Sequence, residues 1–329
     1  MTRFFAHANY DFIGVRKYAY AITAAIILPG LLFLAVRGLN YSIEFTGGTL
    51  FQIHAHRPVD VAAVRSALDA EGIHGAEIQQ FGGQDDYVIR ARVAKAGTDA
   101  NDTQATATEV GKALDSVLGK GNYDVQRTEA VGPKVGSELR QKAFLAIFLS
   151  FFAVLLYLAY RFEWRFGLAA VVATAHDIIA TIAFIAVMRL EVSLVVVGAV
   201  LSMVGYSLND TIIIFDRVRE NLRKHKKDTF AQTLNRSINE TLPRSVLTHG
   251  TTLASLTALA IFGGEVIRPF ALVMFFGVFT GTFSSIYIAS PVLMAIENRW
   301  PGPHARGVKA GKTSPPAPAA PSGRKVTVG

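Results

Sequence analysis

The sequence predicts an α-helical membrane protein with six spanning helices and one folded α+β domain between the first and second of them. Of its 329 residues, 51% are hydrophobic and 18% are charged, less charge than a soluble domain of this size carries. Six apolar runs reach roughly the 20 residues that cross a bilayer. The candidate spans are Tyr18 to Val36, Ala143 to Tyr160, Gly167 to Met188, Val192 to Phe215, Ser245 to Phe262 and Phe270 to Ile296.

Arginine and lysine gather at one end of the spans, which indicates the orientation of the chain. Basic residues precede the first span, lie between spans two and three and between spans four and five, and follow the sixth. Such residues stay on the cytoplasmic side, so both termini are expected there. The net charge of +8 is therefore explained by membrane orientation and does not indicate a nucleic-acid partner. The predicted division is 1–17 cytoplasmic, 18–37 first helix, 38–139 outer domain, 140–298 helices two to six with a basic cytoplasmic loop at 216–243, and 299–329 disordered cytoplasmic tail.

The polar segment 38–139 alternates between strand and helix patterns. Glycines at positions 72, 82, 83 and 119 divide it into six elements in the order β-α-β-β-α-β. That order is typical of a ferredoxin-like split βαβ domain. The expected elements are Thr49 to His54, Val59 to Ala70, Ala76 to Phe81, Tyr87 to Arg92, Thr103 to Leu118 and Tyr123 to Thr128.

Ionisable residues inside the spans are the main functional signal, because each costs about 2.5–3.5 kcal/mol at the centre of a membrane helix. Asp177 lies in the third span, with Thr174 and Thr181 on the same helical face. Asp210 lies in the fourth span and Arg244 opens the fifth. Since these two helices run in opposite directions, Asp210 and Arg244 are expected at similar depth.

Two interpretations of Asp210 and Arg244 remain open. In the first they form a proton relay, since the charge of a buried carboxylate depends on the distance to a cation. In the second they form a static ion pair that only fixes helix packing. Asp177 is a further relay candidate, although neighbouring threonine hydroxyls could satisfy it. His176 and His249 also lie in spans, but without metal-ligand spacing, so we expect hydrogen-bonded interior groups and no metal.

Small residues in the sixth span predict close helix packing. Gly277 and Gly281 form a GxxxG pair, and Ser284 and Ser285 follow one turn later. Catalytic and nucleotide-binding motifs are missing from the sequence, including the phosphate-cradling G-x-x-x-x-G-K-[ST], and it contains no cysteine. We therefore expect neither an enzyme nor an ATP motor, and no cofactor.

Several of these stretches together resemble the SecF family of bacterial protein-export membrane proteins, part of the SecD/SecF group of the resistance-nodulation-division (RND) superfamily. The resemblance runs from about residue 10 to 298. Where the family usually has an Asp after the first span, this chain has Glu44, so acidity is retained. The matching motif residues are Glu44, Phe45, Thr46, Gly47 and Gly48; Gly205, Tyr206, Ser207 and Asn209, followed by Asp210; His176 with Asp177; 131–136; and 281–291.

The resemblance implies half of an RND-type transporter in the bacterial inner membrane, with the 38–139 domain in the periplasm. It implies pairing with SecD, contact with the SecYEG channel, SecA and exported polypeptides, and association with YajC and YidC. Asp210 and Arg244 match the family's relay positions, which implies export assisted by the proton gradient. Small-molecule efflux and a scaffold without motor function are the alternatives.

Overall fold

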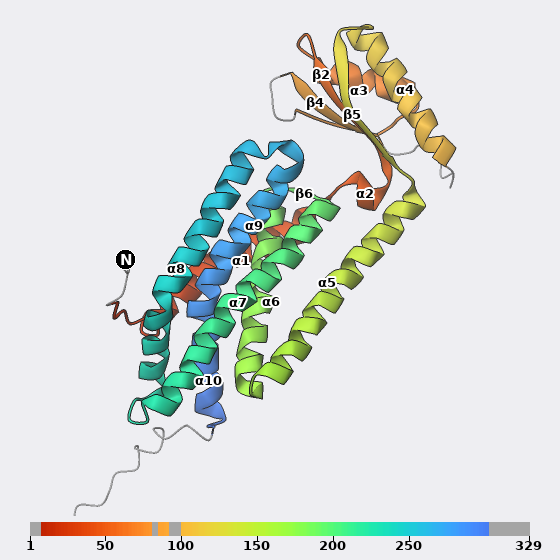
Figure 1. The fold of residues 1–329 in the computed structure, drawn as a ribbon. Coiled ribbons are helices and arrows are strands. Elements are labelled where there is room, and N and C mark those ends of the chain that lie inside the picture. Colours follow the sequence, from red (N-terminus) through yellow and green to blue (C-terminus); the bar gives the residue numbers. More distant parts are fainter. Residues whose placement is uncertain (1–7, 81–84, 92–99, 303–329) are drawn as a thin grey trace, which may run out of the picture.

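The computed structural model describes residues 8–80, 85–91 and 100–302, and consists of a long helical bundle with a small sheet domain at one end (Figure 1). In this part of the chain six helices are long and apolar enough to cross a membrane, which confirms the predicted class. The tail was predicted to begin at residue 299, but α10 includes Arg299 and Trp300 packs against Trp164; the rest of the predicted tail, from residue 303 onward, lies outside the described residues. The bundle consists of α1 Arg16–Arg37, α5 Pro133–Arg161, α6 Trp164–Val187, α7 Leu194–Lys224, α8 Phe230–Phe262, α9 Gly264–Ser284, a π-helical turn at Ser285–Ala289 and α10 Ser290–Arg299.

The sheet domain has four strands in the order β3-β4-β2-β5, all antiparallel to their neighbours. Each βαβ unit is split by a strand from the other unit, which is the ferredoxin-like arrangement expected from the sequence. Apolar residues of the strands and of the two helices close one core, with Ile53, Leu68 and Leu114 fully buried. Its elements are β2 Gly48–Ala55, α3 Val61–Ala70, β3 Glu77–Gln80, β4 Asp86–Ala91, α4 Ala100–Leu118 and β5 Tyr123–Val131.

The connection between the sheet domain and the bundle contains elements that the sequence did not reveal. The two-residue strand β1 (Asn40–Tyr41) pairs in parallel with β6 (Glu191–Val192), which lies just before α7. A single helical turn, α2 (Ile43–Thr46), follows β1. Gly47 and Gly48 then have φ angles of 74° and 135°, values that glycine adopts without steric penalty. This segment thus ties the domain to the start of α7.

Two predicted boundaries differ from the structure. Helix α5 begins at Pro133, ten residues before the expected span, because proline suits the first position of a helix; the sheet domain therefore ends near 132 rather than at 139. The predicted loop 216–243 is mostly helical. Helix α7 continues to Lys224, and α8 begins at Phe230 with a capping box formed by Thr229 and Gln232. Both helices thus extend well beyond their apolar runs.

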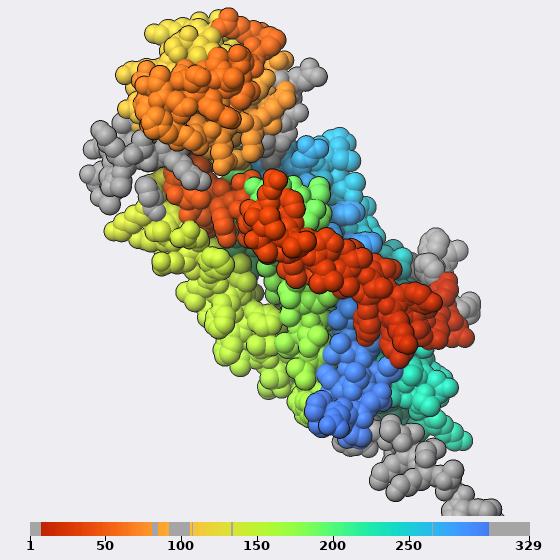
Figure 2. All heavy atoms as spheres, turned by 180° about the vertical axis from the view of Figure 1, so that it is seen from behind, coloured from red at the N-terminus to blue at the C-terminus, as the bar shows by residue number. Residues whose placement is uncertain are grey.

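Helices α6, α7 and α9 form the centre of the bundle, while α1, α5 and α8 lie at its periphery. Figure 2, seen from behind, shows α1 on the near face of the bundle, where it packs against α6, with the sheet domain at the upper end. The contact is close because Gly30 of α1 faces Ala183 of α6, where an added Cβ would lie 2.5 Å from the alanine Cβ. The polar residues predicted from the sequence lie mostly in and around the three central helices.

Candidate functional site: a polar cluster inside the helix bundle

Asp177 is the centre of a hydrogen-bonded group that joins three helices. Its side chain on α6 is fully buried. Ser207 Oγ of α7 and Ser284 Oγ of α9 both donate to Asp177 Oδ2, at 2.5 and 2.7 Å. His176 Nδ1 lies 2.9 Å from Asp177 Oδ1. Within a membrane bundle such bonds hold helices together, so Asp177 links α6, α7 and α9.

The threonines expected to satisfy Asp177 do not do so. Thr174 Oγ1 donates to the backbone carbonyl of Ala170, and Thr181 Oγ1 is buried without a hydrogen-bond partner in the described part of the chain. Both lie on the right helical face, but a hydroxyl in a helix readily bonds to the carbonyl four residues earlier. The sequence did contain the true partners, since Ser207 and Ser284 stood out as motif and packing residues.

Asp210 is another buried carboxylate; it belongs to α7 and faces α8. Ser245 Oγ of α8 donates to Asp210 Oδ1 at 2.6 Å. The other oxygen, Oδ2, is buried and has no partner among the described residues. His249 lies one turn further along α8, with Nδ1 2.6 Å from the carbonyl oxygen of Ser245. The carboxyl group is thus held on one side only, which leaves Oδ2 open to a proton or a new donor.

Arg244 is the expected partner of Asp210, but the structure does not join the two side chains in an ion pair. Arg244 precedes Ser245 on α8 and its side chain is exposed. In the described residues no oxygen of an acid lies within 4.0 Å of its guanidinium. The two side chains thus form no ion pair in this structure, and the relay assignment of Asp210, Arg244 and Asp177, like the static-pair interpretation, stays a prediction.

Motif residues around Asp210 divide between the cluster and the open surface. Tyr206 packs edge-on against His249, and its hydroxyl lies 2.8 Å from Thr252 Oγ1. Ser207 joins the Asp177 group. Gly205 and Asn209 lie on the exposed side of α7. One motif thus serves both the interior of the bundle and its surface.

The small residues of α9 let it approach α7 closely. An added Cβ on Gly277 would lie 2.1 Å from Met203 Cγ, and one on Gly281 would lie 2.7 Å from Ser207 Cβ. Ser285 Oγ lies 2.8 Å from Thr211 Oγ1 of α7. The π-helical turn begins at this serine, and such turns are rare and frequently occur at functional sites. Nothing in the sequence signalled that turn.

Glu44 connects this bundle to the sheet domain. Its Oε2 accepts a hydrogen bond from the backbone N–H of Leu194, the first residue of α7, at 2.6 Å. A carboxylate is favoured at the N-terminus of a helix, where unpaired N–H groups carry partial positive charge. Beside it, Arg90 of β4 forms an ion pair with Glu191. The acid of the glycine-rich motif therefore anchors the helix that carries Ser207 and Asp210.

Metal ligation is not indicated by the side chains in the described ranges, where no group of three or more His, Cys, Asp or Glu residues could hold an ion. The carboxylates of the cluster instead accept hydrogen bonds from serines. The arrangement is suited to holding and moving protons between helices.

The Asp177 group predicts a marked asymmetry between two substitutions. Asp177→Leu leaves the hydroxyl of Ser207 buried without an acceptor, at about 1–3 kcal/mol, and leaves the hydroxyl of Ser284 with only the carbonyl oxygen of Gly281, 3.1 Å away. We therefore expect a clear drop in thermal stability in detergent. Asp177→Asn keeps an acceptor for both serines and should lose much less. Adding Ser207→Ala and Ser284→Ala to the leucine variant should recover part of the loss. Equal stability of the leucine and asparagine variants would contradict the role assigned to this group.

Comparisons with known proteins agree with the architecture. A family model described as protein export membrane protein SecD/SecF, C-terminal, matches residues 110–299, and a SecD/SecF GG motif model matches residues 32–59. The protein translocase subunit SecF of Gemmatimonas aurantiaca is 55% identical over 326 residues, covering 95% of this chain and 96% of that protein. SecF of Escherichia coli O157:H7 is 36% identical over 287 residues, covering 87% and 88%.

Solved structures give the same result. The crystal structure of SecDF, a translocon-associated membrane protein from Thermus thermophilus, superposes with a TM-score of 0.78 and 36% identity. SecDF in its super-membrane-facing form superposes with a TM-score of 0.64 and 35% identity. In both cases the match covers 89% of this chain and 39% of the SecDF chain. With its six spans, ferredoxin-like domain and glycine-rich motif, the chain belongs to the SecD/SecF family of protein-export membrane proteins, as a SecF-like translocase subunit.

Proposed function

We propose that this chain is one half of a two-part, proton-driven membrane transporter that pairs with SecD and assists protein export through SecYEG. The proposal rests on one observation, a polar face on α7 and α8 that nothing covers in the single chain. This polar face consists of Asn209 on α7 and of Arg244, Thr248, Thr251 and Ser255 on α8, all of them exposed.

Contact with lipid is energetically unfavourable for the polar face. The side chains of Asn209 and Arg244 have no hydrogen bond or ion pair to any residue of the described ranges. Polar side chains in membrane helices face a bundle interior or an aqueous cavity, because exposure to hydrocarbon costs several kcal/mol. The exposed polar face therefore favours contact with a second membrane protein, with or without water between the two. The SecDF architecture of the structural relatives supports SecD as that protein.

Asp210 lies directly behind the polar face, which suggests how a proton gradient acts. Movement of α8 against α7 changes both the Ser245–Asp210 hydrogen bond and the distance from Arg244 to the carboxylate. Proton uptake at Asp210 then favours one helix arrangement and proton release favours the other. Moving one charge through the membrane potential supplies about 2.3 kcal/mol per 100 mV, enough to shift such an equilibrium.

Membrane topology completes the proposal. The chain lies in the bacterial inner membrane with both termini in the cytoplasm, as its basic residues predict. The sheet domain then lies in the periplasm, where it holds polypeptides that SecA has pushed through SecYEG; YajC and YidC join the same assembly. Because α2 and Glu44 link this domain to α7, helix movements at Asp210 reach the domain.

Paired tryptophan substitutions on α8 test the partner. Thr251 lies in the polar face, and Thr257 is exposed on the opposite side of the same helix. We expect Thr251→Trp to reduce strongly the amount of SecD-type partner that co-purifies in mild detergent. Thr257→Trp should leave that amount unchanged, since its side chain faces lipid. Equal recovery of the partner with both variants would overturn the assignment of this face.

The rival functions give different results in cells. Loss of drug resistance with normal secretion, in a strain lacking this chain, would favour a small-molecule efflux component. A secretion defect that any inactive but assembled variant corrects would favour a scaffold without motor function.

A further inference from the structure

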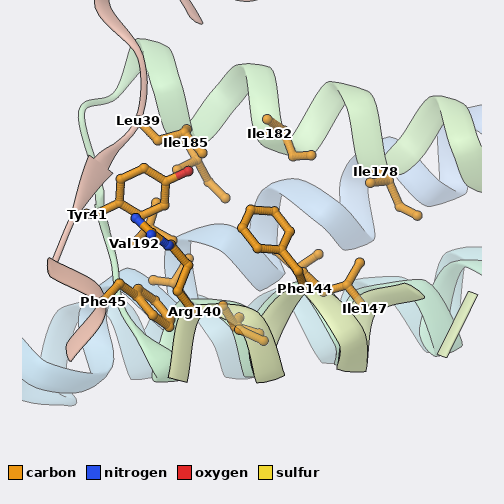
Figure 3. A pocket seen from close by; sticks show the side chains of 14 residues that line it. Leu39, Tyr41, Phe45, Arg140, Phe144, Ile147, Ile178, Ile182, Ile185 and Val192 are labelled. Atoms are coloured by element: carbon orange, nitrogen blue, oxygen red, sulfur yellow. The ribbon is translucent and has the colours of Figure 1, made fainter. Parts of the chain in front are cut away.

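An apolar groove opens between α5 and the rest of the bundle at the end that carries the sheet domain (Figure 3). Its volume is about 110 Å³. The walls come from α5, from α6, from the start of α7 and from the segment that leads into α2. Side chains that line it along the membrane include Phe144, Ile147, Ile178, Ile182, Ile185 and Val200.

Arg140 is the one charged residue lining this groove, and it lies at the groove's domain end. Figure 3 shows its side chain rising from α5 beside the ring of Tyr41. Arg140 is exposed and makes no hydrogen bond or ion pair within the residues that the structure describes. An unpaired guanidinium directly above an apolar space creates a site that is cationic at its mouth and hydrocarbon-like below.

The groove faces away from the polar face of α7 and α8. Helix α5 packs against α2, α6 and α7, whereas α8 packs against α7, α9 and α10, and the two lie at opposite sides of the bundle in Figure 1. Only 6% of the apolar window of α5 is buried. The proposed partner surface and this groove are therefore separate, and the groove opens towards the bilayer.

We propose that the groove is a binding site for an anionic phospholipid, with one acyl chain between α5 and α6 and the phosphate at Arg140. The groove extends from Arg140 to Ile147, roughly 10 Å at 1.5 Å per residue. A helix about 10 Å in diameter cannot enter a space of this volume, but a single hydrocarbon chain can. The guanidinium matches the geometry of a phosphate group, and Arg140 directly precedes the apolar run of α5, which begins at Ala143.

Such a lipid would act on the helix that leads directly from the sheet domain. Strand β5 ends at Val131 and α5 begins at Pro133, so the position of α5 and that of the domain are linked. The acyl chain fills the space that separates α5 from α6 and holds α5 away from the bundle. Through this site, a lipid of the surrounding membrane would contact α5 and so influence the position of the sheet domain.

Native mass spectrometry of the full-length protein, with any partner that co-purifies, tests the site. Phosphatidylglycerol and phosphatidylcholine with identical acyl chains are added in separate titrations. We expect tighter retention of phosphatidylglycerol, and Arg140→Gln should weaken it about fivefold, the effect of one cation near a headgroup. Lys142→Gln removes an equally exposed charge two residues away, outside the groove lining, and should change nothing.

A third variant tests the acyl chain separately. Ala143 lines the groove on α5, and Ala143→Phe should fill it and abolish retention of the specific lipid, whichever headgroup is used. The proposal fails if the parent protein retains no lipid, if the two glutamine variants behave alike, or if Ala143→Phe retains as much lipid as the parent. None of these outcomes depends on export activity or on the identity of the partner.

Discussion

Asp210→Asn is expected to reduce export to the level of membranes that lack this chain, while the complex with the partner still assembles. Asparagine has nearly the same shape as aspartate and keeps an oxygen that can accept from Ser245, whose Oγ lies 2.6 Å from Asp210 Oδ1. It cannot take up or release a proton in the working pH range. Without a change of charge at position 210, the proton gradient cannot shift the equilibrium between the two helix arrangements. The packing of the helices is retained.

The measurement compares proton-gradient-dependent export into inverted membrane vesicles with co-purification of the partner. Asp216→Asn is the matched control, because Asp216 lies on the same helix but forms ion pairs with Arg161 and Arg219 near the basic end of the bundle. We expect this control to retain export. If Asp210→Asn exported as well as the parent, and if Asp210→Asn combined with Arg244→Ala did so too, the chain would be a scaffold and not a motor.

Gly277→Leu is expected to prevent stable folding or to lower the melting temperature in detergent strongly. A Cβ at this position would lie 2.1 Å from Met203 Cγ and 3.0 Å from Met203 Cβ. Overpacking of a closed interface costs about 1–3 kcal/mol and occasionally more. Because Ser207 of α7 and Ser284 of α9 both donate to Asp177 of α6, separating α7 from α9 would disturb this group as well.

Smaller substitutions show whether the loss comes from this contact. Gly277→Ala should be destabilising, and Met203→Ala should relieve that effect in the double variant, because the clash lies with the methionine side chain. Gly198→Ala on α7 is the control, since an added Cβ there meets nothing within 4 Å, and alanine favours a helix by up to about 1 kcal/mol. Thermal unfolding in detergent is measured for the parent, for Gly277→Ala, Met203→Ala and their double variant, and for Gly198→Ala. Additive effects of Gly277→Ala and Met203→Ala would contradict a direct contact.

The function assigned to the chain depends on the two sides of one helix. Helix α7 directs Ser207 and Asp210 into the bundle and Asn209 to the surface, so the buried carboxylate and the proposed partner surface are one residue apart in sequence. Its first residue, Leu194, is held by Glu44. A shift of α7 would therefore change the positions of the carboxylate, of the partner surface and of the attached sheet domain at the same time.

Element types and their order follow from local pattern, and the sequence by itself determined them. Apolar runs of about 20 residues are unfavourable in water and define spans, and the order β-α-β-β-α-β with glycine boundaries defines the sheet domain. Asp177 and Asp210 stood out for the same reason, since a charge inside an apolar run is expensive wherever the neighbouring helices lie. The sequence also identified Glu44 as the acidic residue of its motif, but it did not show that Glu44 binds the backbone N–H of Leu194.

The partners of these residues were decided only by the tertiary structure. Whether Asp210 meets Arg244 or Ser245 depends on the rotation of α8, and one residue along a helix turns a side chain by about 100°. Asp177 bonds to serines on α7 and α9 rather than to threonines on its own helix, because Gly277 and Gly281 bring those helices close. The β1–β6 pair and the π-helical turn likewise depend on contacts between segments far apart in the chain. Sequence periodicity reports which face of a helix is polar, but only the packed bundle decides what that face touches.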